Sequence, residues 1–289
     1  MKKRYFFEIL GYVAFALLLF LLVFMANFPY SALENRIETA VAQRYDQRIN
    51  IRGLDYNFPL GLYFQRLKIQ PDSTYLREAT HISNCNINID LLALITGNTE
   101  ATFKMQLLQG SLHGMLNLDS VLQPQEYDFS IDWERLQLED NPIDYNRNRI
   151  KSIQGFCSGE TKLQGNLDKP LQSSGEGNLE ISEAGAQIEA PPLPQHNFKD
   201  FQGNCNWELE NRKLYIGNCN LKGKGIQGSA DCNLRLNKPL ISSNMDLTAE
   251  IRFTESDPKI YSLVQKYMGT NKLDIELKGR LNNPSYSLN

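Results

Sequence analysis

The sequence has few of the residues that most often carry chemistry. Its 289 residues include three histidines and five cysteines, scattered along the chain. His81, His113 and His196 have no second histidine or cysteine at ligand spacing, so neither a metal site nor a catalytic triad is predicted. The sequence contains no nucleophile elbow, zinc motif or phosphate loop, and we expect a protein without catalytic residues or cofactors.

An excess of positive charge is also missing. The chain carries 30 Lys and Arg against 33 Asp and Glu, with 42% hydrophobic and 22% charged residues. This composition excludes a chain that stays disordered because of its charge. A nucleic-acid-binding protein needs a basic surface, so no nucleic-acid partner is expected.

One long apolar run is present, at the N-terminus. Residues 9–26 are uncharged, and Lys2, Lys3 and Arg4 precede them. We predict a cytoplasmic tip at 1–8, a single transmembrane anchor at 9–28, and the rest of the chain outside the cytosol. A cleavable signal peptide is the alternative, but the run is longer than usual and no clear small-x-small site follows it. Residues spaced along the anchor are Ile9, Val13, Leu17, Leu21 and Phe24.

An amphipathic helix is predicted at 29–48. Ser31 and Glu34 have the spacing of a capping box. An apolar residue recurs every fourth position at Leu33, Ile37, Val41 and Tyr45. The stripe could pack on a β-core or lie along a membrane surface, and the pattern alone does not choose between them.

Beyond Arg48 the apolar residues alternate with polar ones, which is the pattern of half-buried strands. More than ten short strands with almost no helix between them predict one antiparallel β-rich region at 49–289, with a polar seam near 141–149. One helical turn is expected at 91–96, and a helix is expected from Pro258 to a stop at Gly269. Gly223, Gly225 and Gly228 are predicted to form a hairpin turn. The predicted strands are 85–91, 101–107, 112–118, 127–133, 157–167, 177–181, 205–209, 214–221, 230–236, 245–253 and 273–281.

A weak repeat ends three of these strands with a proline. The copies read LQGNLDKP from Leu163, LRLNKP from Leu234 and LKGRLNNP from Leu277. Proline cannot donate to a ladder, so each copy closes a strand and turns the chain. Repeated units of this kind favour an elongated sheet that grows by addition.

The order of these features is similar to a known family. A basic tip and one apolar helix are followed by FPYSAL, by INIRGLDYNFPLGLYFQRLKI with its turn at Pro59 and Gly61, and by LLALITG. This order resembles the N component of the bacterial type II secretion system, the GspN family, and more distantly the AsmA-like envelope proteins. The resemblance implies an inner-membrane-anchored periplasmic protein whose partners are other secretion components. The AsmA-like similarity implies a curved antiparallel sheet with a groove.

The cysteines allow two interpretations. Cys205, Cys219 and Cys232 fall on three successive predicted strands. A hairpin turning near Asn211, with a bulge near Gly217, would bring Cys205 opposite Cys219 and permit a disulfide. The alternative is that all five cysteines are buried free thiols that pack as small hydrophobic residues.

Two functions remain open. The periplasmic region could be an assembly or interaction module of a secretion apparatus that uses exposed strand edges. It could instead bind phospholipid acyl chains in an apolar groove. The alternation shows that one face of the strands is shielded from water. Either a second sheet of an open sandwich or a lipid could cover that face. The predicted groove residues are Phe103, Met105, Phe129, Ile131, Trp133 and Leu247.

Overall fold

The computed structural model describes residues 28–45, 48–57, 60–70, 80–138, 150–190 and 193–288, together with positions 12, 15, 16, 19 and 23. No helix in these parts of the chain is both long enough and apolar enough to cross a membrane. Several predictions fall outside the described residues. They concern the cytoplasmic tip, the anchor residues Ile9, Val13, Leu17, Leu21 and Phe24, the turn residue Pro59, and the seam at 141–149.

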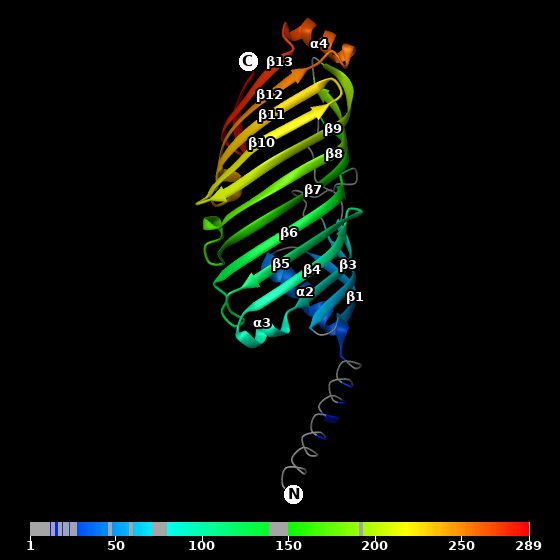
Figure 1. Ribbon diagram of the computed structural model, residues 1–289, viewed down its shortest axis with the longest axis vertical. Helices are drawn as coiled ribbons and strands as arrows, with labels where there is room; N and C mark the ends of the chain where they lie inside the picture. Colours follow the sequence, from blue (N-terminus) through cyan, green and yellow to red (C-terminus); the bar gives the residue numbers. More distant parts are fainter. Residues whose placement is uncertain are drawn as a thin grey trace.

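The protein is mainly β, with fourteen antiparallel strands in a single open sheet and three helices within the described residues. Each strand pairs with its neighbours in the chain, so the sheet is an uninterrupted meander from β1 to β14 (Figure 1). The strands are β1 (Ile49–Asn57), β2 (Gly61–Ile69), β3 (Thr80–Ile89), β4 (Thr99–Leu107), β5 (Gly110–Leu118), β6 (Glu126–Gln137), β7 (Ile150–Asn166), β8 (Ser174–Ala190), β9 (Leu193–Glu210), β10 (Lys213–Gly223), β11 (Ile226–Arg235), β12 (Asn244–Phe253), β13 (Lys272–Arg280) and β14 (Asn283–Leu288).

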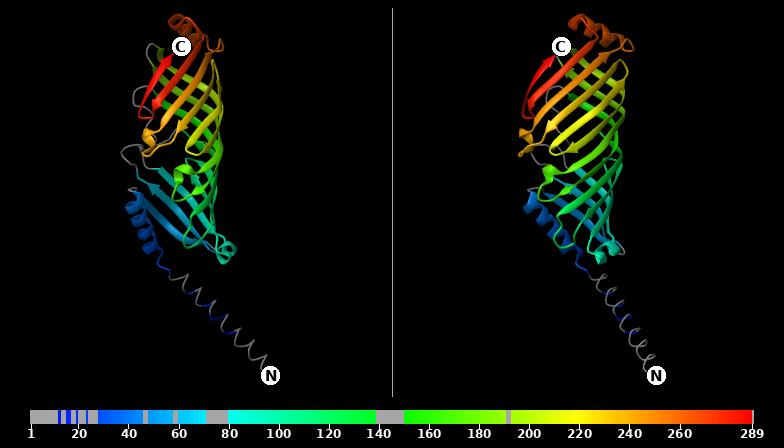
Figure 2. Two further views of the ribbon diagram at one scale, coloured as in Figure 1. Left: turned by 90° about the vertical axis from the view of Figure 1, so that its left-hand side faces the viewer. Right: turned by 60° about the vertical axis from the view of Figure 1, so that its left-hand side comes forward.

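The sheet is curled and elongated (Figure 2). Register shifts interrupt the ladders beside Asn84, Arg135, Glu183 and Asn218, and each of these residues has a positive φ near 50°. A bulge bends its strand and increases the local twist, so these positions help to curve the sheet. The open sandwich was one of the predicted forms. Because all fourteen strands share one sheet, no second sheet within the described residues covers either face.

The helix α2 (Tyr30–Tyr45) covers the first strands. Its Leu33 and Ile37 pack against a buried cluster of Ile51, Leu54, Phe64 and Cys85, which we call the first-strand cluster. Val41 is half-buried. Of the two predicted roles for the stripe, the structure therefore has core packing.

The predicted capping box is wrong. The helix already begins at Tyr30, so Ser31 lies inside its first turn. The Glu34 carboxylate is used elsewhere, since its Oε1 accepts the Leu54 amide of β1 at 2.9 Å. Glu38 Oε1 likewise accepts the Ile51 amide at 2.6 Å. Two helix carboxylates thus bind backbone amides that β1 would otherwise leave unpaired, and this contact satisfies the edge of the sheet.

The two shorter helices confirm their predictions. In α3 (Leu91–Thr96) the Asp90 carboxylate accepts the amides of Leu92 and Ala93, and Gly97 ends the helix at φ 95°. The helix α4 (Pro258–Met268) begins at the predicted proline and is followed by Gly269 at φ 71°. Val264 of α4 is fully buried among Ala184, Phe201, Ile226 and Phe253, which we call the last-strand cluster. The two clusters lie toward opposite ends of the sheet.

Candidate functional site

The candidate site is one face of the sheet. Residues that pair across antiparallel strands point to the same side, so the register defines each face. From β2 to β13 one row of partners is apolar or glycine except for Thr161: Leu62, Ile87, Phe103, Gly114, Ile131, Thr161, Gly177, Trp207, Ile216, Cys232, Leu247 and Leu277. We call this side the apolar face.

The opposite side is polar. The row displaced by one residue passes from Asn86 through Lys104, His113, Asp132, Glu160 and Asn178 to Asn206. The sheet therefore separates a water-facing side from a side whose residues are suited to an apolar environment.

The middle of the apolar face is incompletely covered. The first-strand and last-strand clusters are buried beneath α2 and α4, but the six predicted groove residues are only half-buried. All six, Phe103 and Met105 on β4, Phe129, Ile131 and Trp133 on β6, and Leu247 on β12, lie on this face. Trp207 of β9 belongs with them. The sequence prediction omitted it, although its alternation with Cys205 and Leu209 was a usable signal.

Three large aromatic side chains on this face lie over glycines of the next strand. A Cβ added at Gly114 would meet the Phe103 ring, one at Gly159 would meet Trp133, and one at Gly177 would meet Trp207. Each pair is directly cross-strand. The aromatic ring fills the space above the glycine, which compensates for a residue that otherwise weakens a strand. The rings consequently lie close against the sheet.

A hollow of about 260 Å³ lies within this face between β8 and β12. Its apolar lining includes Leu179, Ile181, Leu221, Ala230 and Ala249. Small residues at the directly paired positions Ala230 and Ala249 open the space, because a larger side chain at either would project into it. The hollow can hold a flexible hydrocarbon segment but offers few groups for polar recognition.

The wall of the hollow contains a disulfide between Cys205 and Cys219. The hairpin turns at Asn211, and the register shifts between Gly217 and Asn220, as the disulfide interpretation required. Of the two interpretations, the structure has the disulfide for this pair, and Cys85, Cys157 and Cys232 are free.

The three free thiols are poorly suited to nucleophilic chemistry. Burial raises the pKa of the Cys85, Cys157 and Cys232 thiols. The thiolate is the reactive form, so a raised pKa keeps each group in its weakly nucleophilic state. Trp133 Nε1 donates to Cys157 Sγ at 3.3 Å, which opposes the shift for that residue.

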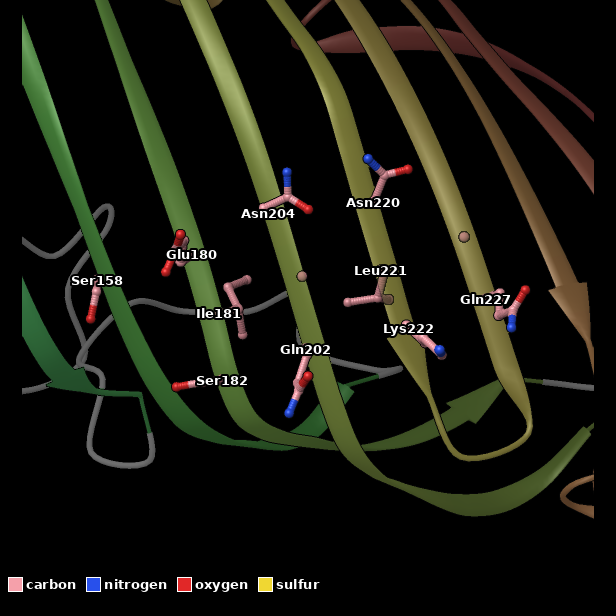
Figure 3. Close-up of a pocket in the computed structure, with 12 residues that line it drawn as sticks. Ser158, Glu180, Ile181, Ser182, Gln202, Asn204, Asn220, Leu221, Lys222 and Gln227 are labelled. Carbon is pink, nitrogen blue, oxygen red and sulfur yellow. The ribbon is translucent and has the colours of Figure 1, made fainter.

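A hollow lined mostly by polar side chains lies over β7–β11 (Figure 3). Its volume is about 670 Å³, and hydroxyl and amide groups such as those of Ser158, Asn204, Asn220 and Gln227 line it together with Glu180 and Lys222. These side chains come from β7, β8, β9, β10 and β11. Figure 3 shows them spread across the sheet instead of converging on one point. Such a surface can hydrogen-bond water or a polar partner. In the part of the chain that the structure describes, no three His, Cys, Asp or Glu side chains gather where a metal ion could bind.

Comparison of the chain with protein-family models, with curated proteins and with solved structures found no match. The resemblance to the N component of type II secretion therefore stays a prediction from the sequence. What can be argued about function rests on the two faces of the sheet.

Proposed function

We propose that the protein binds the acyl chains of lipids on the apolar face of its sheet, in the manner of an AsmA-like groove. One observation carries the proposal: an apolar row runs through twelve strands, and between the two helix-covered clusters its members remain half-buried except for Cys232, which is buried. Contiguous exposed apolar surface of this extent marks an interaction site in soluble domains.

The energetics favour a hydrocarbon ligand. Each methylene that leaves water contributes about 0.8 kcal/mol, so a chain lying along several strands gains many such increments. Hydrocarbon has no hydrogen-bonding groups, and the apolar face offers almost none to it. A lipid would cover the water-accessible middle of the apolar face without requiring a complementary protein surface.

A membrane is the natural source of such a ligand. Near α3 the chain exposes several large apolar side chains, with Leu92 73%, Ile95 78% and Leu122 90% exposed. The Val121 amide donates to the Gly97 carbonyl, which holds the two exposed turns together. We propose that this end of the sheet meets the inner membrane, on the periplasmic side if the predicted anchor and its orientation are correct.

The proposal is tested by photocrosslinking in cells. A photoreactive residue replaces Phe103, Phe129 or Leu247 on the apolar face, and matched variants carry it at Lys104, Asp128 or Asp246 on the polar face. We expect phospholipid adducts from the first set only. Equal lipid adducts from both sets, or none from the first set, would refute acyl-chain binding.

A second candidate is an interaction module of a type II secretion system. The observation that favours it is the difference between the two edges of the sheet. Two carboxylates of α2 bind the β1 edge, whereas no strand within the described residues pairs with the outer edge of β14. An extended segment of a partner could add there as a further strand. If deletion of the gene left protein secretion intact while outer-membrane permeability changed, this candidate would fail.

A further inference from the structure

A basic hollow lies at one rim of the sheet. Strands follow one another as hairpins, so the turns after β7, β9, β11 and β13 all lie on the same rim (left-hand side of Figure 1). The turns after β7, β9 and β11 contribute Lys169, Arg212 and Lys238, and β13 contributes its last residue, Arg280. All four line one hollow of about 680 Å³. Asp168 is the acidic residue among the lining residues. Four bases against one acid is unusual in a chain whose formal net charge is −3.

The four cations lack internal partners. Within the described residues, none of their side chains makes an ion pair or a hydrogen bond. Some basic side chains elsewhere on the sheet do have acidic partners: Lys272 contacts Glu250 and Asp274, and Lys278 contacts Asp246 and Glu276. Like charges gathered without counterions repel one another, and an anionic ligand would relieve that repulsion.

Hydrogen bonds between the turns hold the rim together. The Leu236 amide donates to the Arg212 carbonyl at 2.8 Å, and the Leu281 amide donates to the Ser243 carbonyl at 2.9 Å. These bonds connect the turns after β9 and β13 to the turn after β11. Ser243 is fully buried, and its Oγ accepts the Asn237 amide at 3.0 Å. The backbone that presents Arg212, Lys238 and Arg280 is therefore held by hydrogen bonds between turns before any ligand binds, which lowers the entropic cost of binding.

The sequence repeats the construction of two of the turns. KPLQSS begins at Lys169 and KPLISS begins at Lys238. Short 3-10 helices follow, η1 (Pro170–Gln172) and η2 (Leu240–Ser242), and a nearly inaccessible serine ends each of them. The proline-ended strand repeat seen in the sequence thus places two of its lysines at the same hollow, with Arg280 of the third copy beside them.

We propose that this hollow binds the phosphate of a lipid headgroup whose acyl chains occupy the apolar face. The inference rests on the proposed lipid function and adds the class of ligand, an anionic phospholipid. Phosphate groups are bound by clusters of Arg and Lys through charge-assisted hydrogen bonds. The rim and the 260 Å³ hollow share the strands β8–β12 but not the same end of them, since Ala230 of the hollow lies five residues from Arg235, the last residue of β11 at the rim. At about 3.3 Å per residue an acyl chain would run about 17 Å along the apolar face between the two.

The test uses the full chain in a nonionic detergent with an equimolar mixture of phosphatidylglycerol and phosphatidylcholine of identical acyl chains. Native mass spectrometry measures the ratio of the two adducts. The rim variant combines Lys169→Gln, Arg212→Gln, Lys238→Gln and Arg280→Gln. The control variant changes four exposed bases of the polar face to Gln, at Arg66, Lys68, Lys104 and Lys162.

We expect the wild type and the control to prefer phosphatidylglycerol. In the rim variant the ratio of phosphatidylglycerol to phosphatidylcholine adducts should fall about 25-fold, which corresponds to the loss of two cation contacts at about fivefold each. Its total lipid adducts should persist, because the apolar face is unchanged. An undiminished preference in the rim variant, or an equal loss in the control, would overturn the headgroup site.

Failure of the lipid function would look different, because the wild type would then show no adduct of either lipid. A titration with inorganic phosphate, followed through backbone amide signals of the rim turns, separates the remaining sources. Binding of inorganic phosphate by a wild type that binds no lipid would overturn the headgroup assignment and identify a free-anion site. If inorganic phosphate reduces the phosphatidylglycerol adducts and leaves the phosphatidylcholine adducts unchanged, the headgroup assignment is supported.

Discussion

The hollow between β8 and β12 gives the most specific prediction about acyl-chain binding. Ala230 and Ala249 face each other across β11 and β12, and both line the 260 Å³ space. Ala230→Leu adds an isopropyl group that should occupy part of this space. If each displaced methylene returns to water at about 0.8 kcal/mol, the loss is about 2 kcal/mol, or about 30-fold in affinity.

The protein contains its own reporter for this measurement. Its two tryptophans, Trp133 and Trp207, both lie on the apolar face. A fatty acid brominated in mid-chain should quench their fluorescence on contact, and the same acid without bromine should not. Titration of the full chain with the brominated acid then gives the affinity for wild type and variant.

Asn233→Leu is the matched control, because it places the same side chain on the same strand but on the opposite face, at a residue that does not line the hollow. Asn233 is exposed and pairs with Tyr215 and Asp246. Its affinity should equal that of the wild type, and urea denaturation should show that both variants fold. The reasoning is refuted if Ala230→Leu binds as tightly as the wild type, or if both variants weaken equally.

Four further predictions concern stability. Val264→Ala should lower the free energy of unfolding by about 2 kcal/mol in a urea titration, because the side chain is 0% exposed, whereas Val121→Ala at 43% exposure should have almost no effect. Replacing Cys205 and Cys219 by Ser removes a disulfide between residues 14 apart and should lower the free energy of unfolding by about 3 kcal/mol. A reductant should then lower the urea midpoint of the wild type and leave that of this variant unchanged. Glu38→Ala removes the acceptor of the Ile51 amide, so it should lower the free energy of unfolding by about 1–2 kcal/mol and speed hydrogen exchange of that amide. Glu38→Gln keeps an acceptor and should restore most of the protection from exchange. Hydrogen bonds from Lys272 and Arg252 hold the pKa of the Glu250 carboxyl below its ordinary value. Its stabilising contribution is therefore present above the ordinary pKa of a glutamate in the unfolded chain and is lost as the pH falls through the lowered pKa, so Glu250→Gln should lower the urea midpoint at neutral pH and have no effect in strong acid.

The strands were predictable because alternation is a local property. The predicted segments at 101–107, 112–118 and 245–253 fall within β4, β5 and β12, and the glycine-rich turn after Gly223 joins β10 to β11. Three strands, β1, β2 and β14, were not among the predicted segments. β14 is six residues long and contains Pro284, so its alternation is short and its composition suggests a turn.

Long-range contacts were beyond the sequence pattern. Glu34 has the right spacing for a capping box, but its carboxylate binds an amide 20 residues away. The cations of the rim come from three separate turns and the end of β13, and only the order of the strands brings them together. Alternation likewise identified a dry face without showing what covers it, because that depends on whether the strands form one sheet or two.

The glycines of the apolar face connect sheet construction to the proposed function. A strand glycine opposite an ordinary aliphatic residue would leave a gap and weaken the ladder. Here Trp133 and Trp207 lie over Gly159 and Gly177, so the sheet keeps its packing while the side chains stay low. A β-branched residue at Gly177 would displace both the neighbouring backbone and the Trp207 ring, since an added Cβ would lie 2.5 Å from Trp207 Nε1 and closer still to the Glu160 carbonyl oxygen. Gly177→Val should therefore lower the free energy of unfolding, and it should also reduce either the affinity for the brominated fatty acid or the extent to which that acid quenches tryptophan fluorescence. An unchanged quenching curve in a folded Gly177→Val variant would mean that the low position of the rings has no part in binding.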